Sequence, residues 1–96
     1  MDQQEVVIVT GGSMGIGRAI AERFAKDGAA VVIADVAGAV ETAAEMTAIG
    51  AKAIGVTCDI SDSASCEAMA AAAVDAFGRI DKLVNNAGLY STLKLT

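Results

Sequence analysis

Short apolar runs alternate with segments of helical periodicity along the whole chain. Four of these runs predict strands, at Glu5–Val9, Ala30–Asp35, Lys52–Asp59 and Asp81–Asn85. The second run is apolar on both faces, which is typical of a buried strand in a parallel sheet. The first three runs are each followed by enough residues to form a crossover helix.

Three helices are predicted between these strands from the spacing of their apolar residues. The first helical pattern covers Arg18–Ala25, and Gly50 ends the second. The third begins at a cap within residues 61–63 and is closed by Gly78. The apolar stripe of the second helix is Val40, Ala43, Ala44, Thr47 and Ala48, and that of the third is Cys66, Met69, Ala70, Ala73, Val74 and Phe77.

This alternation predicts an α/β protein with a doubly wound parallel sheet. Right-handed crossovers lead to such a sheet. The expected order of its strands, numbered along the chain, is 3-2-1-4. The direction of winding then reverses between the first and fourth strands. Ligands of such sheets bind at the carboxyl ends of the strands beside that switch point.

A glycine-rich stretch, TGGSMGIG from Thr10 to Gly17, joins the first strand to the first helix. Glycines permit a tight turn and let the backbone approach a pyrophosphate closely. The helix start adds free N–H groups and the positive end of its dipole. The stretch therefore predicts a phosphate site, and the alternative is a strand-to-helix turn that binds nothing.

Asp35 ends the second strand, where an acid can accept hydrogen bonds from the adenosine ribose hydroxyls and repel a 2′-phosphate. Neither Met14 nor residues 36–38 include a base that would neutralise that phosphate. This pattern favours NAD over NADP. The alternative is that Asp35 only caps the next helix.

Two further motifs follow strands along the same predicted edge of the sheet. Asp59 could accept from the adenine amino group while Ile60 lines the ring, although Asp59 could also be a helix cap. Asn85–Gly88 follows the fourth strand, and its paired amides can tie neighbouring strands together and contact the ribose. Taken alone, Asn-Asn-Ala-Gly is an ordinary turn signal.

Composition narrows the function classes. The 96 residues allow one small domain, 54% of them are apolar, and the net charge of −5 with no basic run argues against nucleic acid and against a membrane surface. The apolar runs are too short to span a bilayer. Two cysteines without metal-ligand spacing, in a chain without histidine, predict no metal site and a reduced, cytoplasmic setting.

With these motifs in place, the chain resembles the short-chain dehydrogenase/reductase family over essentially its whole length. The resemblance rests on residues 10–17, Asp35, Asp59 and residues 85–88. It implies a Rossmann-type fold and an NAD-dependent alcohol–ketone oxidoreductase, of which residues 1–96 form an incomplete dinucleotide-binding domain. The cofactor-binding residues that it implies are Gly11, Ser13, Met14, Gly15, Ile16, Gly17, Asp35, Val36, Asp59, Ile60, Asn86, Ala87 and Gly88.

The catalytic Ser and Tyr-x-x-x-Lys of that family lie beyond its Asn-Asn-Ala-Gly element, and the chain ends at Thr96. Tyr90 and Lys94 match the spacing by position, but they fall in the loop after the fourth strand rather than on a long helix. We therefore expect no catalytic residue in this chain and NAD binding without turnover. A small alcohol or ketone would be the substrate of the complete enzyme.

Two other interpretations remain open. One is a non-catalytic nucleotide-binding or assembly module, whose fourth strand is an exposed sheet edge that pairs with a second copy or with the missing half. That interpretation, like the enzyme, predicts an oligomer. The other is a methyltransferase-like nucleotide fold, which also places an acid after the second strand.

Overall fold

A computed structural model of the chain describes residues 4–86. Within them lie four strands and three helices, in strict alternation. The strands are β1 (Val6–Thr10), β2 (Ala30–Asp35), β3 (Ala53–Thr57) and β4 (Lys82–Asn85), and the helices are α1 (Gly15–Lys26), α2 (Ala39–Ala48) and α3 (Ser63–Phe77). All strand pairs are parallel and the order is β3-β2-β1-β4, which confirms the predicted topology.

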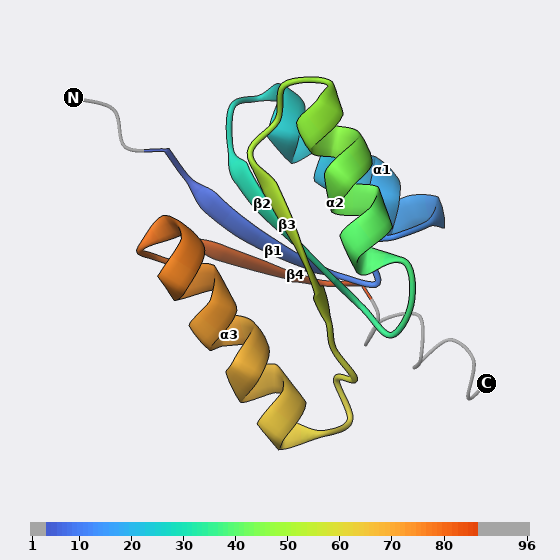
Figure 1. Cartoon of the computed structure of the whole chain (residues 1–96), viewed down its shortest axis with the longest axis vertical. Coiled ribbons are helices and arrows are strands. Elements are labelled where there is room, and N and C mark those ends of the chain that lie inside the picture. The colour runs from blue at the N-terminus through green and yellow to red at the C-terminus, as the bar shows by residue number, and fades with distance from the viewer. Residues whose placement is uncertain (1–3, 87–96) are drawn as a thin grey trace.

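The sheet is the middle of three layers (Figure 1), with α1 and α2 on one face and α3 on the other. Alternate residues of the two central strands supply the two cores. Val7 and Ile33 pack with Met46 of α2 on the first face, while Ile8 and Val32 pack with Met69 of α3 on the second. Both faces of β1 and β2 are thus buried, as their apolar runs predict.

The helix ends follow local chemistry. Asp62 caps α3, since its side chain accepts a hydrogen bond from the N–H of Ala64 at 3.1 Å. Gly78 ends the same helix in the left-handed conformation, with φ of 85°. In contrast, α1 begins at Gly15 rather than at the predicted Arg18, so that the last glycines of the turn already belong to the helix.

The strands at the edges are shorter than predicted. β3 covers Ala53–Thr57 instead of Lys52–Asp59, because the chain turns at Asp59. β4 starts at Lys82, one residue later than predicted. The side chain of Asp81 accepts from the N–H of Val6 at 2.8 Å, and the Asp81 N–H donates to the Val6 carbonyl at 2.9 Å. Asp81 therefore ties the start of β4 to the start of β1.

The predicted stripe of α3 is wider than the buried one. Met69 and Ala73 are buried and Cys66 and Phe77 are partly buried, but Val74 is 47% exposed. Within the described residues, α3 is the only helix on its face of the sheet, so that it contacts the strands along a narrow line. The prediction that Val74 faces the core was wrong for this reason.

Candidate functional site

The carboxyl ends of β1, β2 and β4 meet at one edge of the sheet. Thr10, at the end of β1, lies in register with Ala34 of β2 on one side and with Asn85 of β4 on the other. The Thr10 hydroxyl is 3.1 Å from Oδ1 of Asn85 and 3.3 Å from the Val84 carbonyl oxygen. The winding reverses between β1 and β4 as predicted, and the first amide of the Asn-Asn pair does tie neighbouring strands.

The glycine turn leaves β1 through a left-handed residue. Gly11 has φ of 65°, and its N–H donates to the Ala34 carbonyl at 2.7 Å, which folds the turn against β2. Gly15 also has a positive φ, of 62°, and a Cβ built on it would have no atom within 4 Å. The backbone at the start of α1 is therefore open, as a phosphate site requires.

Gly17 has the opposite surroundings. It is buried, and a Cβ there would lie 2.0 Å from the Gly11 carbonyl oxygen and 2.7 Å from Nδ2 of Asn86. That amide nitrogen donates to the Gly11 carbonyl at 3.3 Å. Gly17 is thus required so that α1 can pack against the turn, and Asn86 holds the turn from the side of β4.

The start of α1 carries no competing negative charge. Met14 occupies the N-cap position with an extended backbone and makes no side-chain capping hydrogen bond. The first turn of α1 contains no acidic residue, whereas α3 is capped by Asp62. The partial positive charge of the α1 terminus is therefore not neutralised from within that helix.

Asp35 sits at the end of β2 and reaches the glycine turn. Its Oδ2 accepts from the Ser13 hydroxyl at 2.5 Å and from the Ser13 N–H at 3.2 Å, and its Oδ1 accepts from the Val36 N–H at 2.7 Å. The N-cap of α2 is Gly38, without a side-chain capping bond. The alternative that Asp35 caps the next helix is therefore wrong.

Apolar side chains surround this edge without being buried. Met14, Ile16 and Val36 are exposed by 72%, 73% and 66%. They flank the glycine turn and Asp35, which are the predicted phosphate and ribose sites. Large exposed apolar side chains gathered around polar groups are typical of a binding surface.

Asp59 forms a turn of its own after β3. Its Oδ1 accepts from the N–H and the hydroxyl of Ser61, at 2.9 and 2.6 Å, and these bonds lower the pKa of the Asp59 carboxyl. The carboxyl is exposed and charged, beside the partly buried Ile60. Because Asp62 caps α3, the alternative that Asp59 is that cap is also wrong. β3 pairs with β2, so that Asp59 follows the strand next to Asp35.

Sequence reasoning missed Thr42, a buried residue of α2 that supports the turn. Its hydroxyl donates to the Ser13 carbonyl at 3.3 Å. The buried residues of α2 are Ala39, Thr42, Ala43 and Met46, whereas the predicted stripe was Val40, Ala43, Ala44, Thr47 and Ala48. Only Ala43 is common to both, so that the predicted stripe was wrong and left Thr42 off the core face. Ala87 and Gly88, predicted to bind the middle of the cofactor, and the Tyr90–Lys94 pair lie outside the described residues.

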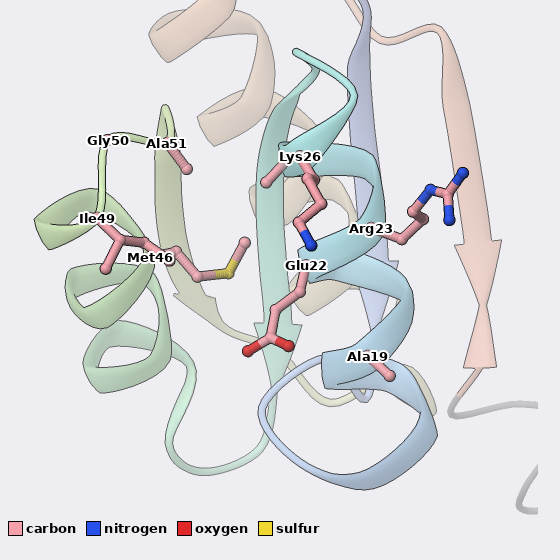
Figure 2. A pocket seen from close by; sticks show the side chains of 9 residues that line it. Ala19, Glu22, Arg23, Lys26, Met46, Ile49, Gly50 and Ala51 are labelled. Atoms are coloured by element: carbon pink, nitrogen blue, oxygen red, sulfur yellow. The ribbon is translucent and has the colours of Figure 1, made fainter.

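A hollow of about 680 Å³ lies elsewhere, between α1 and α2 (Figure 2). Glu22 and Lys26 of α1, Met46 of α2 and Ile49, the residue that follows α2, line it. None of the predicted cofactor residues lines this hollow. Within residues 4–86, no helix is long and apolar enough to cross a membrane, and no three Cys, Asp or Glu side chains gather as metal ligands would.

A parallel sheet of order 3-2-1-4, with alternating helices and a glycine turn at its switch point, defines a Rossmann-type fold. The comparisons with known proteins agree with this class. The family model described as short chain dehydrogenase matches residues 5–96. The chain belongs to this family of oxidoreductases.

Relatives and solved structures extend the comparison. An uncharacterised oxidoreductase of Methylorubrum extorquens is 49% identical over 89 residues, which are 90% of this chain and 36% of the relative. An L-rhamnose 1-dehydrogenase (NAD(P)(+)) of Azotobacter vinelandii is 50% identical over 91 residues, 88% of this chain and 36% of the relative. The chain thus spans 36% of the length of each.

The crystal structure of a short chain dehydrogenase/reductase from Burkholderia phymatum in complex with NAD superposes with a TM-score of 0.81 and 40% identity. The matched region is 84% of this chain and 30% of the Burkholderia phymatum chain. A hydroxysteroid dehydrogenase of Escherichia coli gives a TM-score of 0.82 at 35% identity, over 86% and 35% of the two chains. These likenesses place the fold among short-chain dehydrogenases.

Proposed function

We propose that residues 1–96 form a single dinucleotide-binding unit that holds NAD at the carboxyl edge of its sheet. The observation that carries the proposal is the uncapped start of α1, open at Gly15, beside the carboxylate of Asp35. The helix start suits a pyrophosphate and the carboxylate suits a ribose diol. Asp35 comes from β2, but its hydrogen bonds to Ser13 hold it against the turn that leads into α1. The related protein solved with NAD supports the same ligand.

Each part of the edge would serve a different part of the cofactor. Backbone N–H groups of the turn, with Ser13 and Ile16, would bind the pyrophosphate, while Asp35 would bind the adenosine ribose. Asp59 and Ile60 would flank the adenine, and Asn86, with Ala87 and Gly88, the middle of the molecule. The exposed Met14 and Val36 would lose water-exposed apolar area on binding.

We propose that NAD is preferred over NADP. Asp35 would repel a 2′-phosphate, and the first base after the glycine turn, Arg18, is bound by Glu22 at 3.0 Å and by Glu45 at 2.5 Å. Those two carboxylates raise the pKa of Arg18 and occupy its guanidinium. A base engaged in this way is a poor partner for a phosphate.

The chain spans only 36% of the length of its oxidoreductase relatives. The whole protein would be an alcohol–ketone oxidoreductase, because the chain belongs to the short-chain dehydrogenase family. Bound NAD would be the acceptor of the hydride. The described residues would hold that cofactor, and we assign none of them a role in moving the proton. The free thiols of Cys58 and Cys66 support a reducing, cytoplasmic setting.

Calorimetric titration of the chain with NAD, NADP and S-adenosylmethionine tests the binding proposal. We expect binding of NAD, weaker binding of NADP and none of S-adenosylmethionine. Asp35→Asn, which keeps the size and removes the charge, should reduce the preference for NAD. A chain that binds S-adenosylmethionine and not NAD would overturn the proposal. A dehydrogenase assay with the chain should give no NADH.

The edge of β4 supports a second candidate, a self-associating module. Among the described strands, β4 pairs only with β1, and Leu83 and Ile80 are 57% and 39% exposed. A strand edge that no other described strand covers, with exposed apolar side chains nearby, favours pairing with another chain. Light scattering over a concentration series tests this candidate, and a monomer at every concentration would contradict it.

A further inference from the structure

Two cysteines share the apolar core between α3 and the sheet. Cys58 follows β3 and is 2% exposed, whereas Cys66, in the first turn of α3, is only partly buried. Both pack in the cluster that contains Met69, and both carry free thiols. Neither is among the predicted cofactor residues, so that the proposed function leaves this pair unexplained.

The segment between the two cysteines is folded so that its ends meet. Asp59, the residue after Cys58, donates from its N–H to the hydroxyl of Ser65 at 3.0 Å. Ser65 directly precedes Cys66, whose thiol donates to the Ile60 carbonyl at 3.6 Å. A hydrogen bond also joins the two thiols. The two sulfur atoms are therefore held near each other by contacts on both sides of the segment.

The two thiols differ in access to reagents. Cys66 is open to a small molecule from solvent, whereas the buried Cys58 can react only with a sulfur that is already beside it. Partial burial and the Cys58 thiol raise the pKa of the Cys66 thiol, and the carboxylates of Asp62 and Asp59 act in the same direction. Because the thiolate is the reactive form, Cys66 reacts slowly at neutral pH and faster in alkaline solution.

We propose that Cys58 and Cys66 form a reversible disulfide when the chain meets an oxidised low-molecular-weight thiol such as glutathione disulfide. The Cys66 thiolate attacks one sulfur of glutathione disulfide, and one glutathione leaves as its thiolate. The Cys58 thiol then gives up its proton and attacks the Cys66 sulfur of the mixed disulfide, from which the second glutathione leaves. Two protein thiols are oxidised to one disulfide, and one glutathione disulfide is reduced to two glutathione thiols.

This disulfide closes residues 59–65 into a ring. It joins the start of α3 covalently to the end of β3, and it removes the donor from the Ile60 carbonyl, because a disulfide has no S–H. In a reducing setting the pair stays as thiols. The bond therefore makes the turn after β3 respond to the redox state of the surroundings, whether or not that turn binds a nucleotide.

Incubation of the folded chain with glutathione disulfide, followed by acid quenching, alkylation, trypsin digestion and mass spectrometry, tests the proposal. Trypsin cuts after Lys52 and Arg79, so that both cysteines fall in one peptide, residues 53–79. We expect this peptide to escape alkylation, to weigh two hydrogen atoms less than the unmodified sequence, and to regain both thiols with a reductant. The rate should rise with pH. A peptide that keeps a bound glutathione, cross-linked copies of the peptide, or no reaction even in alkaline solution would overturn the proposal.

Two single-cysteine variants test the assigned roles. Cys58→Ala keeps the accessible thiol and should accumulate the mixed disulfide at Cys66. Cys66→Ala keeps the buried thiol and should stay unmodified while it is folded. Ser63→Ala, at the exposed first residue of α3, is the matched control and should form the disulfide as the original chain does. Equal modification of the two single-cysteine variants would contradict the order of attack.

A measurement on the original sequence needs no variant. If the fold holds the two thiols together, the disulfide is favoured at least about tenfold more in the folded than in the unfolded chain. The oxidised chain should then unfold at a higher urea concentration than the reduced chain, and a reductant should remove the difference. A lower midpoint for the oxidised chain would mean that the fold opposes the bond, and the inference would fail. NAD binding is measured separately, so that this failure would leave the proposed function standing.

Discussion

Replacing Gly17 by alanine has two local effects of opposite sign on the stability of the fold. Gly17 lies inside α1 with an ordinary helical backbone, where alanine is favoured by up to about 1 kcal/mol. Its Cβ position, however, lies 2.0 Å from the Gly11 carbonyl oxygen. The neighbour is backbone, and no side-chain rotation can relieve the contact.

The structure indicates which effect is larger. Forcing an extra methyl into a packed site costs about 1–3 kcal/mol. Moving the Gly11 peptide also disturbs its N–H bond to Ala34, at 2.7 Å, and its carbonyl bond from Asn86, at 3.3 Å, worth about 1 kcal/mol each. The helix preference offsets only part of this cost. We expect a net loss of about 2–4 kcal/mol in the free energy of unfolding.

Urea denaturation followed by circular dichroism measures this loss as a lower transition midpoint at unchanged slope. Gly15→Ala is the matched control, because it has a positive φ of 62° but open space around the added methyl. It should lose only about 1–2 kcal/mol from backbone strain. If Gly17→Ala were as stable as the original chain, helix preference would have prevailed and the close approach of α1 to the turn would be refuted.

Three other substitutions test the rest of the fold. Gly55→Ala places a methyl 2.2 Å from the Ala39 carbonyl oxygen and should lower the urea midpoint; an unchanged midpoint would contradict the close contact of β3 with α2. Met46→Ala removes a side chain that is 1% exposed and should cost about 2–5 kcal/mol by the same assay, whereas a loss below 1 kcal/mol would contradict its core position. Hydrogen bonds from Arg79 and from the Val6 N–H lower the pKa of Asp81 below its ordinary 3.8, so that its stabilising effect is complete above about pH 4 and is lost as the pH falls further. Asp81→Asn should therefore be less stable than the original chain at neutral pH, with a gap that closes in acid; a gap independent of pH would refute this role.

The sequence predicts the strand order because each step of that prediction uses local information. Apolar runs mark the strands and helical periodicity marks the helices. The alternation of the two predicts a doubly wound parallel sheet, and that class of fold gives the order. The sequence does not predict how much of a helix surface is buried by the other elements. Val74 has the correct spacing for the buried stripe of α3, yet its exposure depends on how many helices share that face, which no local pattern records.

The same limit applies to the candidate site. Gly17, Asp35 and Asn86 could be selected from their positions after strands, because parallel strands bring their carboxyl ends to one edge. The contact between Ser13 and Asp35 joins residues from different loops, and its direction depends on the turn at Gly11. Residue types indicated which groups reach the edge, and only the folded backbone indicates which of them bind one another.

The glycine turn is held in place by hydrogen bonds to other parts of the fold. The Gly11 N–H reaches β2, the Gly11 carbonyl receives Asn86 after β4, and the Ser13 carbonyl receives Thr42 of α2. Three separate elements thus fix a segment rich in glycine, whose freedom would otherwise make binding costly. The start of α1, in contrast, has neither a side-chain cap nor an acid in its first turn. A rigid backbone around a helix terminus whose own first turn holds no acid favours an anion, and this supports a ligand at the turn independently of any likeness to other proteins.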